Sequence, residues 1–258
     1  MIEKAIEKIK AADLVLVGIG EALDISDRIE KEEYYQRAVA ELGETESAWM
    51  LPFLNREMCK KRENEMLRIY EPLTACLKEK NYFVVSLCQD GILRESSLDR
   101  SRLVEPCGGY ERLQCSRKCT AELYPVPEGI FEQISRFRDG YEKNKPEEPL
   151  CPKCGSPLVF NNVNAENYAE EGYLEGWMHY RKWLQGTVNK NLFVLELGVG
   201  MRYPTVVRWP FEKIVFFNQK AELFRVHEKL CQVAEEIAER AHGICQKPEE
   251  FLMELYAK

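Results

Sequence analysis

Two short cysteine pairs are the clearest local signature in this chain. The first pair is Cys115 and Cys119, and the second is Cys151 and Cys154, which Gly155 follows. Pairs of this kind form two tight turns whose four sulfur atoms converge on one metal ion at about 2.3 Å. We therefore predict a structural zinc site, because four protein ligands leave no open position for water or substrate. The alternative is that these four cysteines are incidental thiols that bind no metal.

The residues around these cysteines differ in composition from the rest of the chain. From Cys107 to about Asn167 the sequence is rich in proline, glycine, cysteine and charged residues and shows no long strand pattern. We expect residues 107–167 to form a small zinc-binding module inserted into a larger domain made of residues 1–106 and 168–258. A segment this short would depend on the metal to hold it together.

Short apolar runs outside this segment predict the fold of the larger domain. Runs rich in Val, Ile and Phe, typical of buried parallel strands, cover residues 14–17, 82–87, 192–197 and 214–217. Amphipathic helix patterns cover residues 57–80, 171–185 and 222–242. Strands that alternate with helices require crossover connections. We therefore predict an α/β fold with a Rossmann-like parallel sheet flanked by helices.

The overall charge argues against several kinds of partner. The 258 residues carry 36 Lys and Arg against 43 Asp and Glu, a formal net charge of -7. Nucleic acids and anionic membranes need clustered basic residues, so neither is an expected partner. The N-terminal residues lack the apolar stretch of a secretory signal, and no run is long enough for a membrane span. We expect a cytoplasmic protein whose ten cysteines are metal ligands, core residues or reactive thiols.

Two glycine turns follow two of the predicted strands. The turns are Gly18-Ile19-Gly20-Glu21 and Gly198-Val199-Gly200. At the carboxyl ends of parallel strands such turns meet in the crevice where open α/β folds bind ligands, and they let a pyrophosphate approach the backbone. Leu23 replaces the third glycine of the dinucleotide fingerprint. The alternative is that the glycines only form turns between strands and helices.

Taken in order, these motifs resemble those of the sirtuin family over most of the chain. The matching segments are residues 17–21 for the family's Gly-Ala-Gly turn, 86–91 for Thr-Gln-Asn-Ile-Asp-Gly, 107–108 for His-Gly, 197–200 for Gly-Thr-Ser, and Phe217-Asn218 for Ile-Asn. Residues 196–211 are particularly similar to the macrodomain-linked sirtuin branch. The resemblance implies a sirtuin-type NAD-binding fold that carries structural Zn²⁺ in its four-cysteine module.

The resemblance also implies a function and a set of binding residues. Sirtuins are NAD-dependent protein deacylases or mono-ADP-ribosyltransferases, so NAD or ADP-ribose and a modified protein substrate are the implied partners. NAD is expected in an interdomain cleft. The residues implied to contact it are Gly18, Ile19, Gly20, Glu21, Asp90, Gly198, Val199, Gly200 and Asn218, of which Asn218 would meet the adenosine ribose. For Asp90, initiation of an Asp-Gly turn is an equal alternative.

The reacting centre departs from the family pattern. Cys107 stands where the family has its histidine base, and Cys88 stands where it has an asparagine. The catalytic residues are therefore unknown, and three hypotheses stay open: an enzyme with a replacement for the base, an inactive module that binds NAD, ADP-ribose or a protein, and a scaffold that binds no nucleotide. A thiol becomes a nucleophile only beside a base or a cation, and no histidine lies near Cys107 in sequence.

The remaining histidines and cysteines are expected to have structural roles. His179 lies on one helix pattern, and His227 and His242 lie on the last one, remote from any motif. None of these is a good candidate for a general base. The cysteines on helix patterns, for which packing is the simplest role, are Cys59, Cys76, Cys231 and Cys245.

Overall fold

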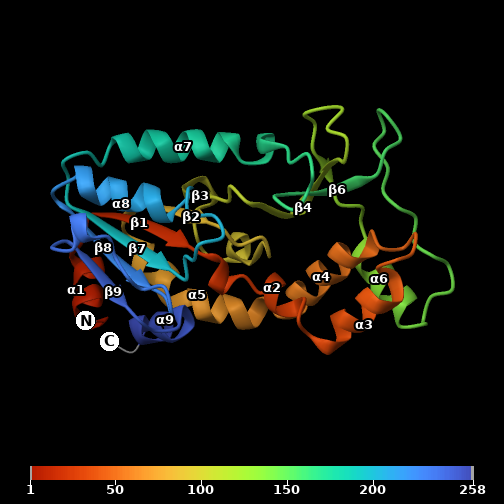
Figure 1. Ribbon diagram of the computed structural model, residues 1–258, viewed down its shortest axis with the longest axis horizontal. Helices are drawn as coiled ribbons and strands as arrows, with labels where there is room; N and C mark the ends of the chain where they lie inside the picture. Colours follow the sequence, from red (N-terminus) through yellow and green to blue (C-terminus); the bar gives the residue numbers. More distant parts are fainter. Residues whose placement is uncertain (1, 257–258) are drawn as a thin grey trace.

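A six-stranded parallel sheet lies between layers of helices in the left half of the molecule as drawn in Figure 1. The computed structural model describes residues 2–256. The strands follow the order β3-β2-β1-β7-β8-β9, and every neighbouring pair is parallel. Their bounds are β1 Leu14–Ile19, β2 Asn81–Ser86, β3 Leu103–Val104, β7 Leu192–Leu197, β8 Ala221–Val226 and β9 Ala241–Ile244. The predicted Rossmann-like α/β fold is confirmed.

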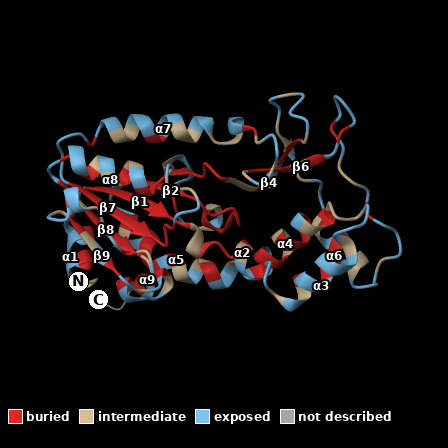
Figure 2. Ribbon diagram, in the orientation of Figure 1, coloured by how far each residue is buried: buried red, intermediate tan, exposed pale blue. Residues whose placement is uncertain are grey.

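Helices cover both faces of this sheet, because alternate strand residues point to opposite sides. Val15 and Val17 face a core with α1 (Ile2–Ala11), α5 (Glu63–Leu77) and α9 (Pro248–Tyr256). Leu14 and Leu16 face a second core with α7 (Leu174–Gln185) and α8 (Arg208–Phe217). Figure 2 shows the strands almost wholly buried between these layers. Within residues 2–256, no helix has both the length and the apolar character needed to span a bilayer.

A three-stranded antiparallel sheet, ordered β5-β4-β6, forms beside the central sheet. Its strands are β4 Gly108–Cys115, β5 Tyr124–Pro125 and β6 Leu158–Asn162, and α6 (Ile130–Arg138) packs against α4 (Met50–Lys61). The other α-helices are α2 Ser26–Ile29 and α3 Glu33–Leu42. Short 3₁₀ helices cover Glu21–Leu23, Ile92–Glu95, Arg100–Arg102, Glu170–Gly172 and Glu235–Ile237. The domain boundaries given above stay a prediction.

Two secondary-structure predictions are wrong, and a third, of one helix, is divided into two helices. Residues 214–217 belong to α8 rather than to a strand, and the buried residues Arg208, Phe211 and Val215 recur at helical spacing. Residues 222–242 form β8, a 3₁₀ helix and β9 rather than one helix. Residues 57–80 contain two helices, α4 and α5, which meet at Arg62. In the first two cases the apolar or charged pattern was compatible with both a helix and a strand.

Cys231 and Cys245 form a disulfide, which corrects their assignment to helical packing positions. Cys231 lies in the loop after β8, and Cys245 directly follows β9. The expected packing role therefore fails for these two cysteines. The bond joins the loop after β8 to the end of the neighbouring strand.

Glu222 at the start of β8 joins α1 to the sheet, and we expect this contact to depend on pH. Its carboxylate lies 3.0 Å from Lys4 Nζ, 2.7 Å from Lys8 Nζ and 2.8 Å from His242 Nε2. Burial raises the pKa of Glu222, but the hydrogen bonds from Lys8 and Lys4 outweigh it and lower the pKa from 4.5 to about 2. A lowered native pKa stabilises the fold above pH 4.5, and this contribution is lost as the pH falls toward 2.

Glu222→Gln is therefore expected to lower the free energy of unfolding at pH 6 by about 1 kcal/mol or less, because the pair is partly exposed. Denaturant unfolding should show the difference from the native chain shrinking between pH 5 and pH 3. A difference that stays constant over this range would contradict the assignment.

Candidate functional site

The two glycine turns meet at the carboxyl edge of the central sheet, as predicted. The Gly20 amide donates to Leu197 O at 2.8 Å, and the Ala22 amide donates to Gly198 O at 3.2 Å. A Cβ atom on Gly20 would collide with the backbone of Gly198 and Val199. Gly20 is therefore needed so that the two turns can touch. Gly18 lies deeper, where a Cβ atom would collide with side chains of α8.

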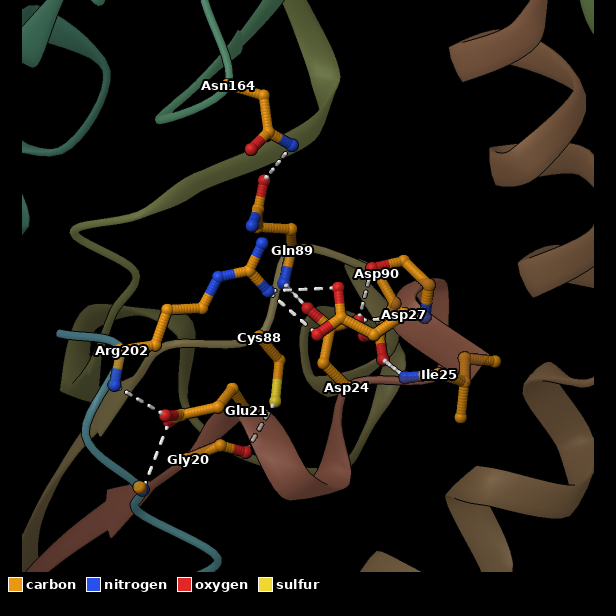
Figure 3. A network of polar contacts seen from close by, with 12 residues as sticks. Gly20, Glu21, Asp24, Ile25, Asp27, Cys88, Gln89, Asp90, Asn164 and Arg202 are labelled. Carbon is orange, nitrogen blue, oxygen red and sulfur yellow. Dashed lines mark hydrogen bonds and ion pairs between the residues drawn. The ribbon is translucent and has the colours of Figure 1, made fainter. Parts of the chain in front are cut away.

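The Glu21 carboxylate occupies the backbone donors of the second turn. Its oxygens accept from the Gly200 amide at 3.2 Å and from the Arg202 amide at 3.1 Å (Figure 3). The Arg202 guanidinium in turn donates to both oxygens of Asp27, at 3.0 and 2.7 Å. These contacts join the loop after β1 to the loop after β7. Two backbone N–H groups at this edge therefore bind an anionic group, here a carboxylate of the chain itself.

Two buried carboxyl groups hold the adjacent loops together. Asp24 accepts from the Gln89 amide at 2.7 Å, and Asp90 accepts from the Ile25 amide at 3.1 Å and the Ile92 amide at 3.0 Å (Figure 3). Burial, and then the nearby charge of Asp24, raise the pKa of Asp90 to about 8. Both oxygens of Asp90 are already engaged by the backbone. The structure thus shows a loop-ordering role for Asp90 next to the glycine turns.

Cys88 and Cys107 are both buried, each with 1% of its surface exposed. The Cys88 thiol donates to Gly20 O at 3.5 Å. Burial raises the pKa of Cys107 to about 12 and that of Cys88 well above its ordinary value. Neither thiol pairs with a histidine in the part of the chain that the structure describes. Both thiols are therefore protonated near neutral pH and are poor nucleophiles.

Asn218 lies at the opposite edge of the sheet and is not brought together with the glycine turns. It caps α8 before β8 begins, and its Nδ2 donates to Thr187 O at 3.2 Å and Lys190 O at 3.0 Å, just before β7. The strand expected to end at Asn218 is absent, because that segment is helical. Asn218 thus orders the turn between α7 and β7.

His227 is the residue that follows β8 at the carboxyl edge. Its Nδ1 accepts from the Lys229 and Leu230 amides, each at 3.0 Å. In the neutral ring the proton is therefore on Nε2, which is left as a donor. Burial lowers the pKa of His227, and the charge of Glu21 acts in the opposite direction. The sequence prediction missed His227 because it placed this segment on a helix.

A buried ion-pair network supports the loop that follows His227. Arg225 donates to Glu196 at 2.6 and 3.1 Å, to Glu212 at 2.8 Å and to Gln232 O at 2.6 Å. Arg225 and Glu196 are completely buried. Arg208 donates to Val199 O at 3.1 Å and to the carbonyls of residues 230 and 232. The network therefore fixes the second glycine turn relative to the loop after β8.

The four predicted cysteine ligands gather at one end of the three-stranded sheet. Their sulfur atoms all lie within 4.8 Å of one another, with Cys115 Sγ 3.5 Å from Cys154 Sγ and Cys119 Sγ 3.6 Å from Cys151 Sγ. Four sulfurs at about 2.3 Å around a tetrahedral ion lie about 3.8 Å apart, so the cluster fits such an ion. Gly155, at φ +70°, forms the second turn and donates to Cys151 O at 2.8 Å. The cluster could hold a metal ion.

Two curated relatives resemble the chain in sequence. It is 24% identical over 255 residues to "Protein ADP-ribosyltransferase" of Staphylococcus aureus (strain Mu50), a match that covers 90% of this chain and 79% of the relative. It is 29% identical over 150 residues to "Probable bifunctional ADP-ribose hydrolase/ADP-ribosyltransferase" of Fusarium oxysporum f. sp. cubense, which covers 56% of this chain and 25% of that protein. No protein-family model matches the chain.

A solved structure described as "Sir2 bound to acetylated peptide" superimposes on the whole chain. The TM-score is 0.51 at 14% sequence identity, and the match covers 100% of this chain and 98% of the other. The chain has the sirtuin fold. The resemblance predicted from the sequence motifs is confirmed, and this sirtuin-like chain has its glycine turns, Glu21 and His227 at one edge of the sheet.

Proposed function

We propose that the protein binds NAD at the carboxyl edge of the sheet and transfers ADP-ribose from it to a protein acceptor. The observation that carries this proposal is the sequence similarity to a named protein ADP-ribosyltransferase along 90% of the chain. In such a transfer the bond between ribose C1′ and nicotinamide breaks. Its electron pair leaves with nicotinamide, and an acceptor nucleophile forms a new bond to C1′.

The residues at this edge suit the anionic part of such a ligand. The Gly200 and Arg202 amides already bind a carboxylate, and a phosphate is an anion that backbone N–H groups bind in the same way. Of the residues expected to contact NAD, we retain Ile19, Gly20, Gly198, Val199 and Gly200. Glu21 competes for the same backbone donors, and Asp90 orders the neighbouring loop. Gly18 supports the turn from beneath, and His227 replaces Asn218 as the polar residue after a strand, with Nε2–H as its donor.

An inactive module that binds NAD or ADP-ribose is the second candidate. The buried, protonated thiols of Cys88 and Cys107 favour it, because neither can act as the base that the family's histidine supplies. The Glu21 carboxylate on the backbone donors does not separate the two candidates, since a phosphate would have to displace this side chain in either.

We also propose that the four-cysteine cluster binds Zn²⁺ in a structural role. All four ligands are thiolates of the chain, which suits zinc and leaves no position for a reacting group. When bound, the ion would supply a cross-link between the end of β4 and the turn at residues 151–155. It would take no part in the chemistry at the sheet edge.

Calorimetry with ADP-ribose and an assay of nicotinamide release from NAD test the function. We expect saturable binding of ADP-ribose, and nicotinamide release when a protein acceptor is present. Glu21→Gln is expected to tighten ADP-ribose binding several-fold, because it removes a negative charge that competes for the backbone donors. Glu236→Gln, at an exposed position away from this edge, is the matched control and should change nothing.

Each result separates the candidates. Binding without nicotinamide release, at high protein concentration and with acceptor proteins present, would refute the transferase and support the inactive module. No saturable heat with either nucleotide would refute both.

A further inference from the structure

A cavity of about 570 Å³ lies beside the edge where the glycine turns meet. It is bounded by α2 and α4 on one side and by β4, β6 and the loop after β6 on the other. Asp27 and Arg202, the ion pair that links the two sheet-edge loops, lie at its border, whereas Gly20, Glu21 and Gly200 are not part of its lining. The cavity thus adjoins the proposed NAD site and shares Arg202 with it.

Aromatic side chains form the inner wall of this cavity. Tyr35, Phe53, Tyr110 and Phe160 line it and are each more than nine-tenths buried. The rings of Phe53 and Phe160 lie 4.5 Å apart between centroids, and those of Tyr110 and Phe160 lie 5.0 Å apart at a steep angle. The partly buried Trp49 adds to the lining. Packed rings of this kind form a preformed wall that suits an aliphatic stem or a cation.

The charges around the cavity are predominantly negative. Its lining includes the carboxylates of Asp27, Glu30, Glu148 and Glu166, and Arg202 is its one cationic residue. Arg202 is already paired with Asp27. Within the described part of the chain, Glu30, Glu148 and Glu166 form no salt bridge, although the charges of Arg202 and Lys31 act on Glu30. A cation that entered would therefore find unpaired carboxylates.

Two mostly buried side chains in the lining each carry a polar atom without a protein partner. Tyr110 is only 5% exposed, and its hydroxyl makes no hydrogen bond within residues 2–256. Asn162 is 3% exposed; its Oδ1 accepts from the Asn164 amide at 3.0 Å, but its Nδ2 has no acceptor among the described residues. Neither the Tyr110 hydroxyl nor the Asn162 Nδ2 is closed off from solvent, so both atoms open onto the cavity and can hydrogen-bond a ligand there.

We propose that this cavity receives the cationic side chain, lysine or arginine, of the protein that accepts ADP-ribose. The inference rests on the proposed function and names the acceptor class for it. The Tyr110 hydroxyl can accept from an ammonium or guanidinium group, and the aromatic wall holds the apolar stem. The Asn162 amide can donate to a carbonyl of the acceptor backbone. An acylated lysine lacks the charge that Glu30, Glu148 and Glu166 would pair with.

The transfer to such an acceptor balances without another reactant. For a lysine, the ammonium group loses one proton to solvent, and the freed lone pair forms the bond to C1′. The electron pair of the broken C1′–N bond leaves with nicotinamide. No oxidation or reduction occurs.

Peptide binding to the full chain, measured by fluorescence anisotropy without NAD, tests the proposal. Four labelled peptides would differ only at a central residue, which is lysine, arginine, acetyl-lysine or norleucine. We expect the lysine and arginine peptides to bind about tenfold more tightly than the other two, as one hydrogen-bonded charge contributes about this factor. Tyr110→Phe should weaken the lysine peptide by about tenfold, and Glu236→Gln should leave it unchanged.

Three results would overturn the proposal. These are equal binding of lysine and acetyl-lysine peptides, absence of binding by all four, and competitive displacement of the lysine peptide by NAD. The last result would assign the cavity to the cationic pyridinium ring of NAD itself. The peptide-binding measurements contain no NAD and do not depend on catalysis. A failed nicotinamide-release assay would therefore refute the transferase, whereas the binding data alone decide whether the cavity prefers cationic peptides.

Discussion

Cys115→Ser is expected to abolish binding of the metal and to lower the free energy of unfolding by about 3 kcal/mol or more. Cys115 ends β4, is completely buried, and belongs to the same core cluster as Cys151. Structural zinc contributes to folding directly, because the unfolded chain has no preformed site. Loss of one thiolate therefore removes the cross-link and leaves a polar hydroxyl in a buried position.

Cys76→Ser is the matched control, because Cys76 lies half-buried on α5, outside the four-cysteine cluster. Metal content measured by mass spectrometry should be one zinc per chain for the native protein and for Cys76→Ser, and none for Cys115→Ser. A chelator should lower the melting temperature of the first two to that of Cys115→Ser. Native protein that carries no metal, or that is as stable after chelation as before, would refute the zinc site.

The parts of the fold that the sequence predicted are those determined by local pattern. The strand at residues 192–197 has the predicted bounds, and the runs at 14–17 and 82–87 fall on β1 and β2 within two residues. Buried parallel strands are apolar on both faces, so their composition alone identifies them. The four-cysteine cluster was predictable for a similar reason. The short spacing within each cysteine pair determines the turn that brings its two sulfur atoms together.

The errors came from residues whose environment depends on distant partners. β8 contains Glu222 and Arg225, which resemble the solvated face of a helix when the sequence is taken alone. In the structure Arg225 is fully buried, because Glu196 on the neighbouring strand β7 neutralises it. This pairing joins residues 29 positions apart and leaves no local periodicity. The helix assigned to this segment then concealed His227, the polar residue at the end of β8.

The candidate site was predicted in part for the same reason. The two glycine turns follow strands that were placed correctly, so their meeting at one edge followed from the topology. Asn218 was assigned to that edge through a strand that is helical, and it lies at the other edge. The Glu21 carboxylate on the Gly200 amide is a contact between side chain and loop that no spacing rule predicts.

Arg225→Met is expected to cost about 3 to 5 kcal/mol of stability, because it leaves Glu196 buried without the cation that is hydrogen-bonded to both of its oxygens. Burial already raises the pKa of Glu196, and Arg225 opposes this shift. Without Arg225 the pKa rises further, so the buried carboxylate is protonated at mildly acidic pH. A raised native pKa destabilises the fold most at high pH, and this cost decreases as the pH falls. The loss measured by denaturant unfolding should therefore be larger at pH 8 than at pH 5.

A second substitution separates the charge effect from a simple loss of packing. Glu196→Leu combined with Arg225→Met removes both buried charges, and it should recover part of the lost stability and eliminate its pH dependence. Arg181→Met, at an exposed helix position, is the control and should be neutral. Because Arg225 also binds Gln232 O, the double variant should still bind ADP-ribose more weakly than the native chain. A double variant less stable than Arg225→Met alone would show that packing, and not the unpaired carboxylate, dominates at this site.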